Sequence, residues 1–201
     1  MKILSALLIS VVFVLAGCQQ ASSPVSETPE VIQSTQNTSK AIVLYYSRTG
    51  TTRVVANTIQ EALDCDLQEI KDLKDRSGIK GFWGGTKDVS DKVKADIKPE
   101  MLDLAAYDLI LICSPVWVQH FAPAVTTFME TIDFNDKKIV LAAVARIGMN
   151  DEKRDELKKD ISSKGGEVIK DFVIKTWFQS PDDIEGLTKE QIKDITGLQS
   201  K

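Results

Sequence analysis

Residues 41–52 read AIVLYYSRTGTT. The first six form a continuous run of apolar, β-rich side chains, which is typical of a strand buried on both faces. The next six form a short loop rich in hydroxyl groups, and residues 52–63 then place apolar side chains at helical spacing. A buried strand, a tight loop and a helix in this order predict the first unit of an α/β domain with a parallel sheet.

The same alternation continues along the chain. Helices are expected at residues 122–132, at 150–164 under an Asn150 cap, and in a short final segment that a capping box at Thr188 opens. Right-handed crossovers between the strands then predict one α/β domain over residues 41–201. Further strands are expected at 67–70, where the pattern is weak, and at 107–113, 138–145 and 167–174.

Residues 75–100 resist assignment. They combine a dense mixture of charges with Gly78, Gly81, Gly84 and Gly85. Because glycine is about 1 kcal/mol less favourable than alanine inside a helix, we expect a loop with a broken helix here.

The loop after the first strand has the composition of an anion site. Helix N-termini present free backbone N–H groups and a partial positive charge to an anion. The segment matches neither a triphosphate P-loop nor the Gly-x-Gly-x-x-Gly fingerprint, which favours a terminal monophosphate as the ligand. The alternatives are a loop that merely caps the helix and, for Arg48, a side chain that points to solvent. The predicted loop residues are Ser47, Arg48, Thr49, Gly50, Thr51 and Thr52.

Two further segments follow strands that end at the same edge of the predicted sheet. Ser114-Pro115-Val116-Trp117 comes after the third strand, and Arg146-Ile147-Gly148-Met149 after the fourth. Trp117 offers a planar face on which an aromatic ligand can stack. The alternative for Trp117 is a core aromatic that covers the sheet edge.

These segments resemble the flavodoxin family. Residues 46–52 are similar to its Ser/Thr-x-Thr-Gly-x-Thr loop around the FMN phosphate, and residues 114–117 to a Ser-Pro-x-Trp segment that flanks the isoalloxazine. The resemblance implies a three-layer fold with a five-stranded parallel sheet in the order 2-1-3-4-5. It also implies that the 146–149 loop borders the ring, with Met149 where relatives often have a second aromatic. The implied FMN contacts are Ser47, Arg48, Thr49, Gly50, Thr51, Thr52, Ser114, Pro115, Val116, Trp117, Ile147 and Gly148.

The amino terminus has the pattern of an export signal. Residues 3–17 are uncharged and follow Lys2, and they are too short to span a bilayer, as in a signal peptide. Leu15-Ala16-Gly17-Cys18 resembles the lipobox of bacterial lipoproteins, which implies cleavage after residue 17 and a lipid on Cys18. An uncleaved anchor with an incidental cysteine is the alternative. Residues 19–40 are rich in Ser, Thr, Gln and Pro and lack aromatics, which predicts a disordered tether.

Composition excludes several classes of protein. With 25 basic and 29 acidic residues, the net charge is −4, which argues against a nucleic-acid partner. Three cysteines are too few for a disulfide-built scaffold, and the single histidine, His120, excludes a multi-histidine metal site. Cys65 and Cys113 read as small buried side chains, although a disulfide between them is an alternative.

These observations predict a lipid-anchored FMN electron-transfer protein of the cell envelope, outside the cytoplasm. The expected partners are a redox protein or a quinone, together with the membrane that holds the lipid. No side chain is expected to be catalytic and no metal is expected, because the flavin carries the chemistry. The alternatives are an FMN-dependent NAD(P)H:quinone oxidoreductase and a flavin-free binding lipoprotein with the same fold.

Overall fold

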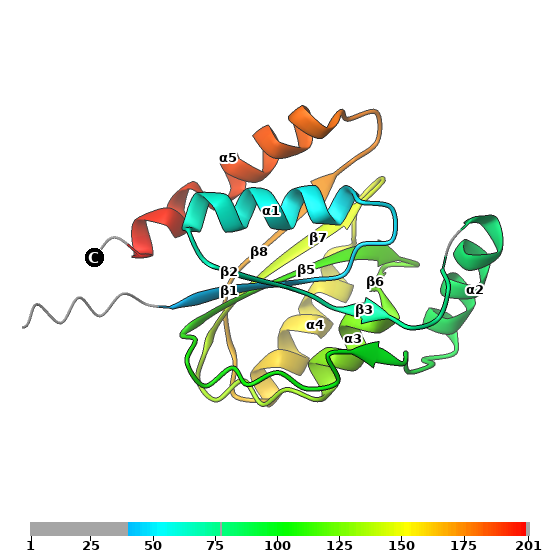
Figure 1. The fold of residues 1–201 in the computed structure, drawn as a ribbon, viewed down its shortest axis with the longest axis horizontal. Coiled ribbons are helices and arrows are strands. Elements are labelled where there is room, and N and C mark those ends of the chain that lie inside the picture. The colour runs from blue at the N-terminus through cyan, green and yellow to red at the C-terminus, as the bar shows by residue number, and fades with distance from the viewer. Residues whose placement is uncertain (1–39, 77, 200–201) are drawn as a thin grey trace, which may run out of the picture. The chain divides into compact units, whose positions relative to one another are not determined.

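A parallel sheet forms the centre of the domain (Figure 1). The computed structural model describes residues 40–76 and 78–199. The sheet order is β2-β1-β5-β7-β8, and every neighbouring pair is parallel, so the predicted 2-1-3-4-5 order is confirmed. The five strands are β1 (Ala41–Tyr45), β2 (Asp66–Glu69), β5 (Leu109–Trp117), β7 (Lys138–Ala145) and β8 (Glu167–Lys175).

Helices cover both faces of this sheet (Figure 1). On one face, α1 (Thr51–Leu63) and α5 (Pro181–Gln199) pack on strand residues such as Val43 and Leu111. On the other, α3 (Pro123–Glu130) and α4 (Asp151–Ser163) pack on Leu44 and Ile112. Successive strand residues therefore face opposite layers, as buried parallel strands require. The expected three-layer architecture is confirmed.

The structure corrects the prediction that residues 114–117 come after the third strand. Strand β5 continues through them, with Ser114 opposite Ala143 and Pro115 opposite Val144 of β7. A short strand, β6 (His120–Phe121), folds back and pairs antiparallel with the end of β5. Proline is tolerated because β1 has already ended at Tyr45, so no carbonyl of β1 lies opposite the missing N–H of Pro115. The Pro115 carbonyl accepts a hydrogen bond from the Ala122 amide at 3.2 Å.

Residues 75–100 contain a helix, α2 (Gly78–Ser90), where we expected a loop with a broken helix. The helix forms because two of its glycines allow close packing: a β carbon at Gly81 would lie 2.1 Å from the backbone of Arg76, and one at Gly85 would lie 2.7 Å from Trp117. The first approach is local, five residues back along the chain, whereas the second is a tertiary contact, and together they offset the low helix propensity of glycine. A small antiparallel pair, β3 (Lys71–Asp72) and β4 (Ile97–Lys98), connects the segment to the domain.

The last helix begins earlier than predicted. The Ser180 hydroxyl accepts a hydrogen bond from the Asp183 amide (3.2 Å), and the Asp183 carboxylate accepts one from the Ser180 amide (2.9 Å), which is the capping box of α5. Thr188 lies inside the helix, where its hydroxyl donates to the carbonyl of Ile184, so the predicted cap at Thr188 is wrong. The predicted Asn150 cap of α4 is confirmed, because its side chain accepts from the Lys153 amide at 2.9 Å.

The predicted signal peptide, the lipobox residue Cys18 and the tether up to residue 39 lie outside the described residues. Within the described part of the chain, no helix has the length and apolar character needed to cross a bilayer.

Candidate functional site

The predicted site residues lie in three segments at the carboxyl end of the sheet. Residues 47–50 follow β1, residues 114–117 form the end of β5, and residues 146–149 follow β7. Because the three strands are parallel, their carboxyl ends share one edge of the sheet. Ligands of open α/β sheets bind at this edge, where the strand order reverses.

Ser47 organises the loop between β1 and α1. Its hydroxyl oxygen accepts hydrogen bonds from the backbone amides of Gly50 (3.1 Å) and Arg53 (3.2 Å). Gly50 has φ +95°, a left-handed conformation that side chains other than glycine rarely adopt. The chain therefore turns tightly at Gly50 and enters α1 with Ser47 beneath the turn.

The loop leaves several donors available. Within the described part of the chain, no residue accepts a hydrogen bond from the backbone amides of Thr49, Thr51 or Thr52. The hydroxyl oxygens of Thr49 and Thr51 lie 3.5 Å apart. Amides at a helix N-terminus carry partial positive charge and bind anions. The arrangement fits a phosphate group better than it fits a helix cap, because Ser47 already supplies the cap.

Arg48 does not simply point to solvent. Its guanidinium is half-buried and donates to the carbonyl oxygen of Arg76 at 3.5 Å, just before α2. The phosphate-loop candidate is thereby connected to the segment that carries α2.

Trp117 lies between the sheet and α2. Its ring makes an edge contact with Tyr46, with centroids 5.9 Å apart and an interplanar angle of 81°. Gly85 of α2 approaches the ring so closely that a β carbon there would be 2.7 Å away. The indole is only partly buried, so some of its surface still faces solvent. The ring is thus both a packing element and a wall of the candidate site.

A buried ion network beside Trp117 was not predicted. The Arg76 guanidinium binds Asp72 at 2.8 Å and also Asp88, and it lies 6.0 Å from the Trp117 ring. The side chains of Arg76 and Asp72 are 4% and 2% exposed. Buried charges of this kind are retained only when they are paired. The four-residue spacing of Asp72 and Arg76 is the sequence signal for their ion pair. Asp88 could not be recognised as the second partner, because it lies in α2 and the glycines of that segment argue against a helix.

The same network affects Tyr46. Burial, reinforced by the negative charge of Asp72, raises the pKa of Tyr46 to about 12. The phenol, which is neutral at physiological pH even at its ordinary pKa, is here still harder to ionise. Together with Trp117 it gives the site an uncharged aromatic wall.

The loop after β7 has one exposed and one buried apolar residue. Ile147 is 72% exposed, whereas the Met149 side chain is buried in the core below α3 and α4. Met149 therefore does not take the place of a second stacking aromatic. The adjacent Arg146 guanidinium lies 4.6 Å from the ring of Trp177, in the loop after β8. Trp177 and Phe178 also belong to this edge, although no sequence motif marks them.

The remaining titratable candidates are packing residues. His120 pairs with Trp117 across the β5–β6 hairpin, and burial together with the charge of Lys153 lowers the pKa of His120. Cys65 and Cys113 are both free thiols, and burial raises the pKa of Cys65 to about 11. Over residues 40–76 and 78–199, no group of His, Cys, Asp or Glu side chains is arranged to hold a metal ion.

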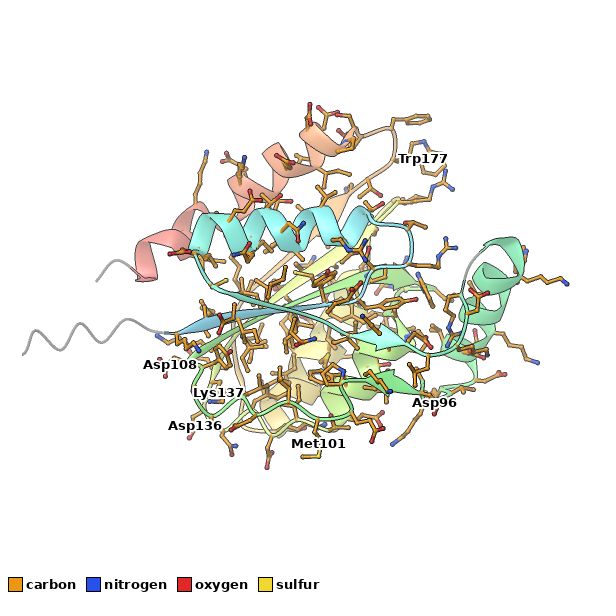
Figure 2. All side chains as sticks on the ribbon, viewed as in Figure 1. Asp96, Met101, Asp108, Asp136, Lys137 and Trp177 are labelled. Carbon is orange, nitrogen blue, oxygen red and sulfur yellow. The ribbon has the colours of Figure 1, made fainter. Side chains whose placement is uncertain are left out.

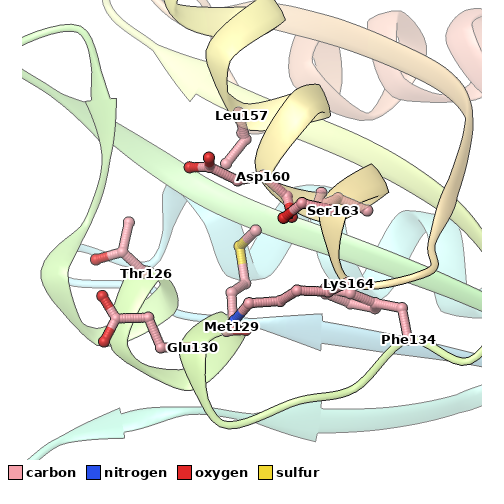
Figure 3. A pocket seen from close by; sticks show the side chains of 9 residues that line it. Thr126, Met129, Glu130, Phe134, Leu157, Asp160, Ser163 and Lys164 are labelled. Atoms are coloured by element: carbon pink, nitrogen blue, oxygen red, sulfur yellow. Dashed lines mark hydrogen bonds between the residues drawn. The ribbon is translucent and has the colours of Figure 1, made fainter.

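A separate hollow of about 240 Å³ lies between α3 and α4 (Figure 3). Its wall includes Met129, Leu157 and Ile161, and the Lys164 ammonium donates to the carbonyl of Met129 at 2.8 Å. None of the predicted site residues lines it. It is therefore distinct from the site at the sheet edge.

A comparison with protein-family models shows which family the chain belongs to. The family model described as flavodoxin matches residues 40–180, which include every strand and all three loops of the site. The chain belongs to the flavodoxin family. No curated protein compared with the chain matches it.

Solved structures extend the comparison to individual flavodoxin-like proteins. A candidate flavoprotein from Bacteroides uniformis is 25% identical and has a TM-score of 0.63, with 75% of this chain and 98% of the other covered. A flavoprotein from Lactobacillus acidophilus, solved in complex with FMN, is 25% identical and has a TM-score of 0.58, with 67% and 93% covered. A candidate flavoprotein from Bacteroides eggerthii shares the fold at 21% identity, a TM-score of 0.59 and coverage of 76% and 98%.

Proposed function

We propose that this domain binds FMN at the carboxyl end of its sheet and transfers electrons through it. The observation that carries the proposal is a set of three backbone amides, at Thr49, Thr51 and Thr52, that have no acceptor among residues 40–76 and 78–199. They lie next to two threonine hydroxyls at a helix N-terminus. The FMN complex of the related Lactobacillus acidophilus flavoprotein supports the choice of ligand.

Each part of the site has a role in this proposal. The amides and hydroxyls of residues 49–52 hold the phosphate. The Ser47 hydroxyl holds the loop in place by accepting hydrogen bonds from the Gly50 and Arg53 amides. Tyr46 and Trp117 form an apolar wall at the ring, and the backbone of Ile147 and Gly148 borders it. FMN supplies the electron chemistry when bound, and the protein supplies binding, orientation and electrostatics. No side chain of the site is required to act as a nucleophile or a general base.

Flavin titration tests the proposal. Purified full-length protein in detergent is titrated into FMN, and quenching of flavin fluorescence reports binding. We expect saturable quenching with one FMN per chain, and the absence of quenching would contradict the proposal. Addition of NAD(P)H and a soluble quinone to the complex then separates the roles, because steady NAD(P)H consumption would identify an oxidoreductase rather than a carrier.

We also propose that a lipid on Cys18 anchors the protein to the outer leaflet of the cytoplasmic membrane or within the periplasm. The support is the apolar, uncharged run of residues 3–17 followed by Leu15-Ala16-Gly17-Cys18. Metabolic labelling with radioactive palmitate should mark the wild type and not the Cys18→Ser variant. Equal labelling of the two proteins would exclude Cys18 as the acceptor.

A further inference from the structure

Three loops at the carboxyl end of the sheet form a continuous rim. The amide of Asn150, after β7, donates to the Gln119 side chain in the β5–β6 turn at 2.7 Å. The amide of Trp177, after β8, donates to the carbonyl of Arg146 at 3.2 Å. These bonds hold the three loops together. The rim exposes four large apolar side chains: Val118 (52%), Ile147 (72%), Trp177 (43%) and Phe178 (94%).

The backbone of Phe178 is in a strained conformation. The Gln179 amide donates to the carbonyl of Thr176, which closes a tight turn, and Phe178 has φ +60° at its third position. Glycine is the favoured residue there, and a bulky side chain in this conformation is uncommon. The ring is 94% exposed, and its contact with the neighbouring Trp177 ring, with centroids 5.5 Å apart, joins two exposed side chains rather than burying Phe178. The position of Phe178 therefore indicates a role outside the fold.

Cations flank this apolar tip. The Arg146 guanidinium lies on the Trp177 ring, and Lys175 lies close enough to Gly148 that its Cε would be 3.8 Å from a β carbon there. Among the residues that the structure describes, neither cation has a carboxylate within ion-pair distance. The acids nearest along the chain are Asp171, four residues before Lys175, and Asp151, five residues after Arg146. Both already pair with other cations: Asp171 binds Arg154 and Lys158, and Asp151 binds Arg154.

We propose that this rim, formed by Val118, Ile147, Trp177 and Phe178, inserts into the interfacial region of a bilayer that contains anionic lipids. Aromatic and aliphatic side chains next to Arg and Lys suit that region, where rings are buried and cations meet headgroups. The rim presents projecting side chains, whereas small-molecule sites are concave. Exposed apolar patches of this kind mark protein or membrane contacts.

The proposed anchor favours the membrane over a protein partner. The 22 residues 19–40 extend to at most about 75 Å, which exceeds the about 30 Å length of the nine-residue strand β5. The rim can therefore reach the bilayer even though the chain enters the domain at the opposite end of β1. An anchored domain also needs only weak insertion, because the tether keeps its effective concentration high. The inference thus builds on the proposed anchor, and it turns the FMN-site edge toward membrane-dissolved electron carriers.

Depth-dependent fluorescence quenching tests insertion without FMN. Full-length protein is reconstituted into vesicles of phosphatidylethanolamine and phosphatidylglycerol, with brominated or ordinary acyl chains. Bromine quenches tryptophans that enter the bilayer, and the Trp177→Phe variant isolates the contribution of that residue. We expect the Trp177 emission to fall by more than about half in brominated vesicles, as interfacial burial of the ring requires.

Matched variants identify the surface involved. Phe178→Gly relieves the strained turn and so preserves folding, which circular dichroism checks, and it should reduce Trp177 quenching. Met101→Ser is the control, because Met101 is 77% exposed but lies away from Trp177 (Figure 2) and should leave the quenching unchanged. Equal quenching of the wild type and Phe178→Gly would overturn the proposal.

Vesicle flotation distinguishes rim insertion from lipid anchoring alone and from dimer formation. Protein that floats with vesicles while Trp177 remains unquenched would overturn rim insertion and leave the anchor intact. Protein that neither floats nor is quenched would overturn both. A dimer that forms through Phe178 without quenching would show that the rim binds a second copy of the chain instead. FMN binding is measured in detergent, so its failure would not alter these readouts.

Discussion

The indole ring of Trp117 rests on the backbone of Gly85, at a distance that leaves no room for a β carbon: one would lie 2.7 Å from the ring. The contact joins the end of β5 to α2, which are far apart in the sequence. It explains how a helix containing four glycines remains folded, and it places α2 at the border of the candidate FMN site.

Alanine substitutions at two adjacent glycines test this contact. Gly84 has open space where its β carbon would be, so Gly84→Ala should stabilise the protein by up to about 1 kcal/mol through helix propensity. Gly85→Ala has the same propensity gain but collides with Trp117, and overpacking costs about 1–3 kcal/mol. Urea unfolding should therefore rank Gly84→Ala above the wild type and Gly85→Ala below Gly84→Ala. Equal stability of the two variants would disprove the contact.

Loss of Arg76 should be severe. Arg76→Met leaves the buried Asp72 carboxylate without its partner, and breaking such a pair costs about 3–5 kcal/mol. The matched control is Lys74→Met, since Lys74 also binds Asp88 but is 56% exposed and should contribute at most about 1 kcal/mol. Chemical denaturation of both variants measures the difference, and similar losses would contradict the burial argument.

The network should also make the protein sensitive to acid. Burial raises the pKa of Asp88, but hydrogen bonds from Lys74 and Arg76 outweigh it and hold the pKa below its ordinary value. Because the folded-state pKa is the lower one, this contribution to stability is complete above about pH 4 and is lost as the pH falls through the folded pKa. Unfolding free energies measured from pH 6 downward should fall less steeply in Asp88→Asn than in the wild type. Parallel curves would refute this.

The phosphate loop can be tested by comparing two flavins. Thr49→Val with Thr51→Val removes two hydroxyls that riboflavin, which lacks a phosphate, would not contact. Hydrogen bonds to charged groups contribute about 1.5–3 kcal/mol, so FMN affinity should fall at least about tenfold. Riboflavin affinity is the internal control and should change little. An equal loss for both flavins would mean that the loop does not hold the phosphate.

Much of the fold could be predicted from short-range patterns. The runs of apolar residues at 41–46 and 139–145 identify buried strands, since near-continuous apolar runs are typical of strands covered on both faces. The loop at 47–52 is recognisable because a hydroxyl-rich turn between a strand and a helix is a local feature. The start of the last helix was mispredicted because two positions carry the capping-box sequence pattern, Ser180 and Thr188. Only the packing of Ile184 in the core shows that the helix starts at the earlier one.

The sequence by itself determined the alternation of strands and helices, the order of the sheet through its family pattern, and the position of the phosphate-loop candidate. Only the tertiary structure decided that a glycine-rich segment is helical, that Arg76 is buried between Asp72 and Asp88, and that Ile147, Trp177 and Phe178 share one rim. The physical reason is the range of the interactions. Periodicity and turn chemistry act over a few residues. Close packing, ion pairing and the grouping of exposed side chains on one surface depend on which distant segments the sheet brings together.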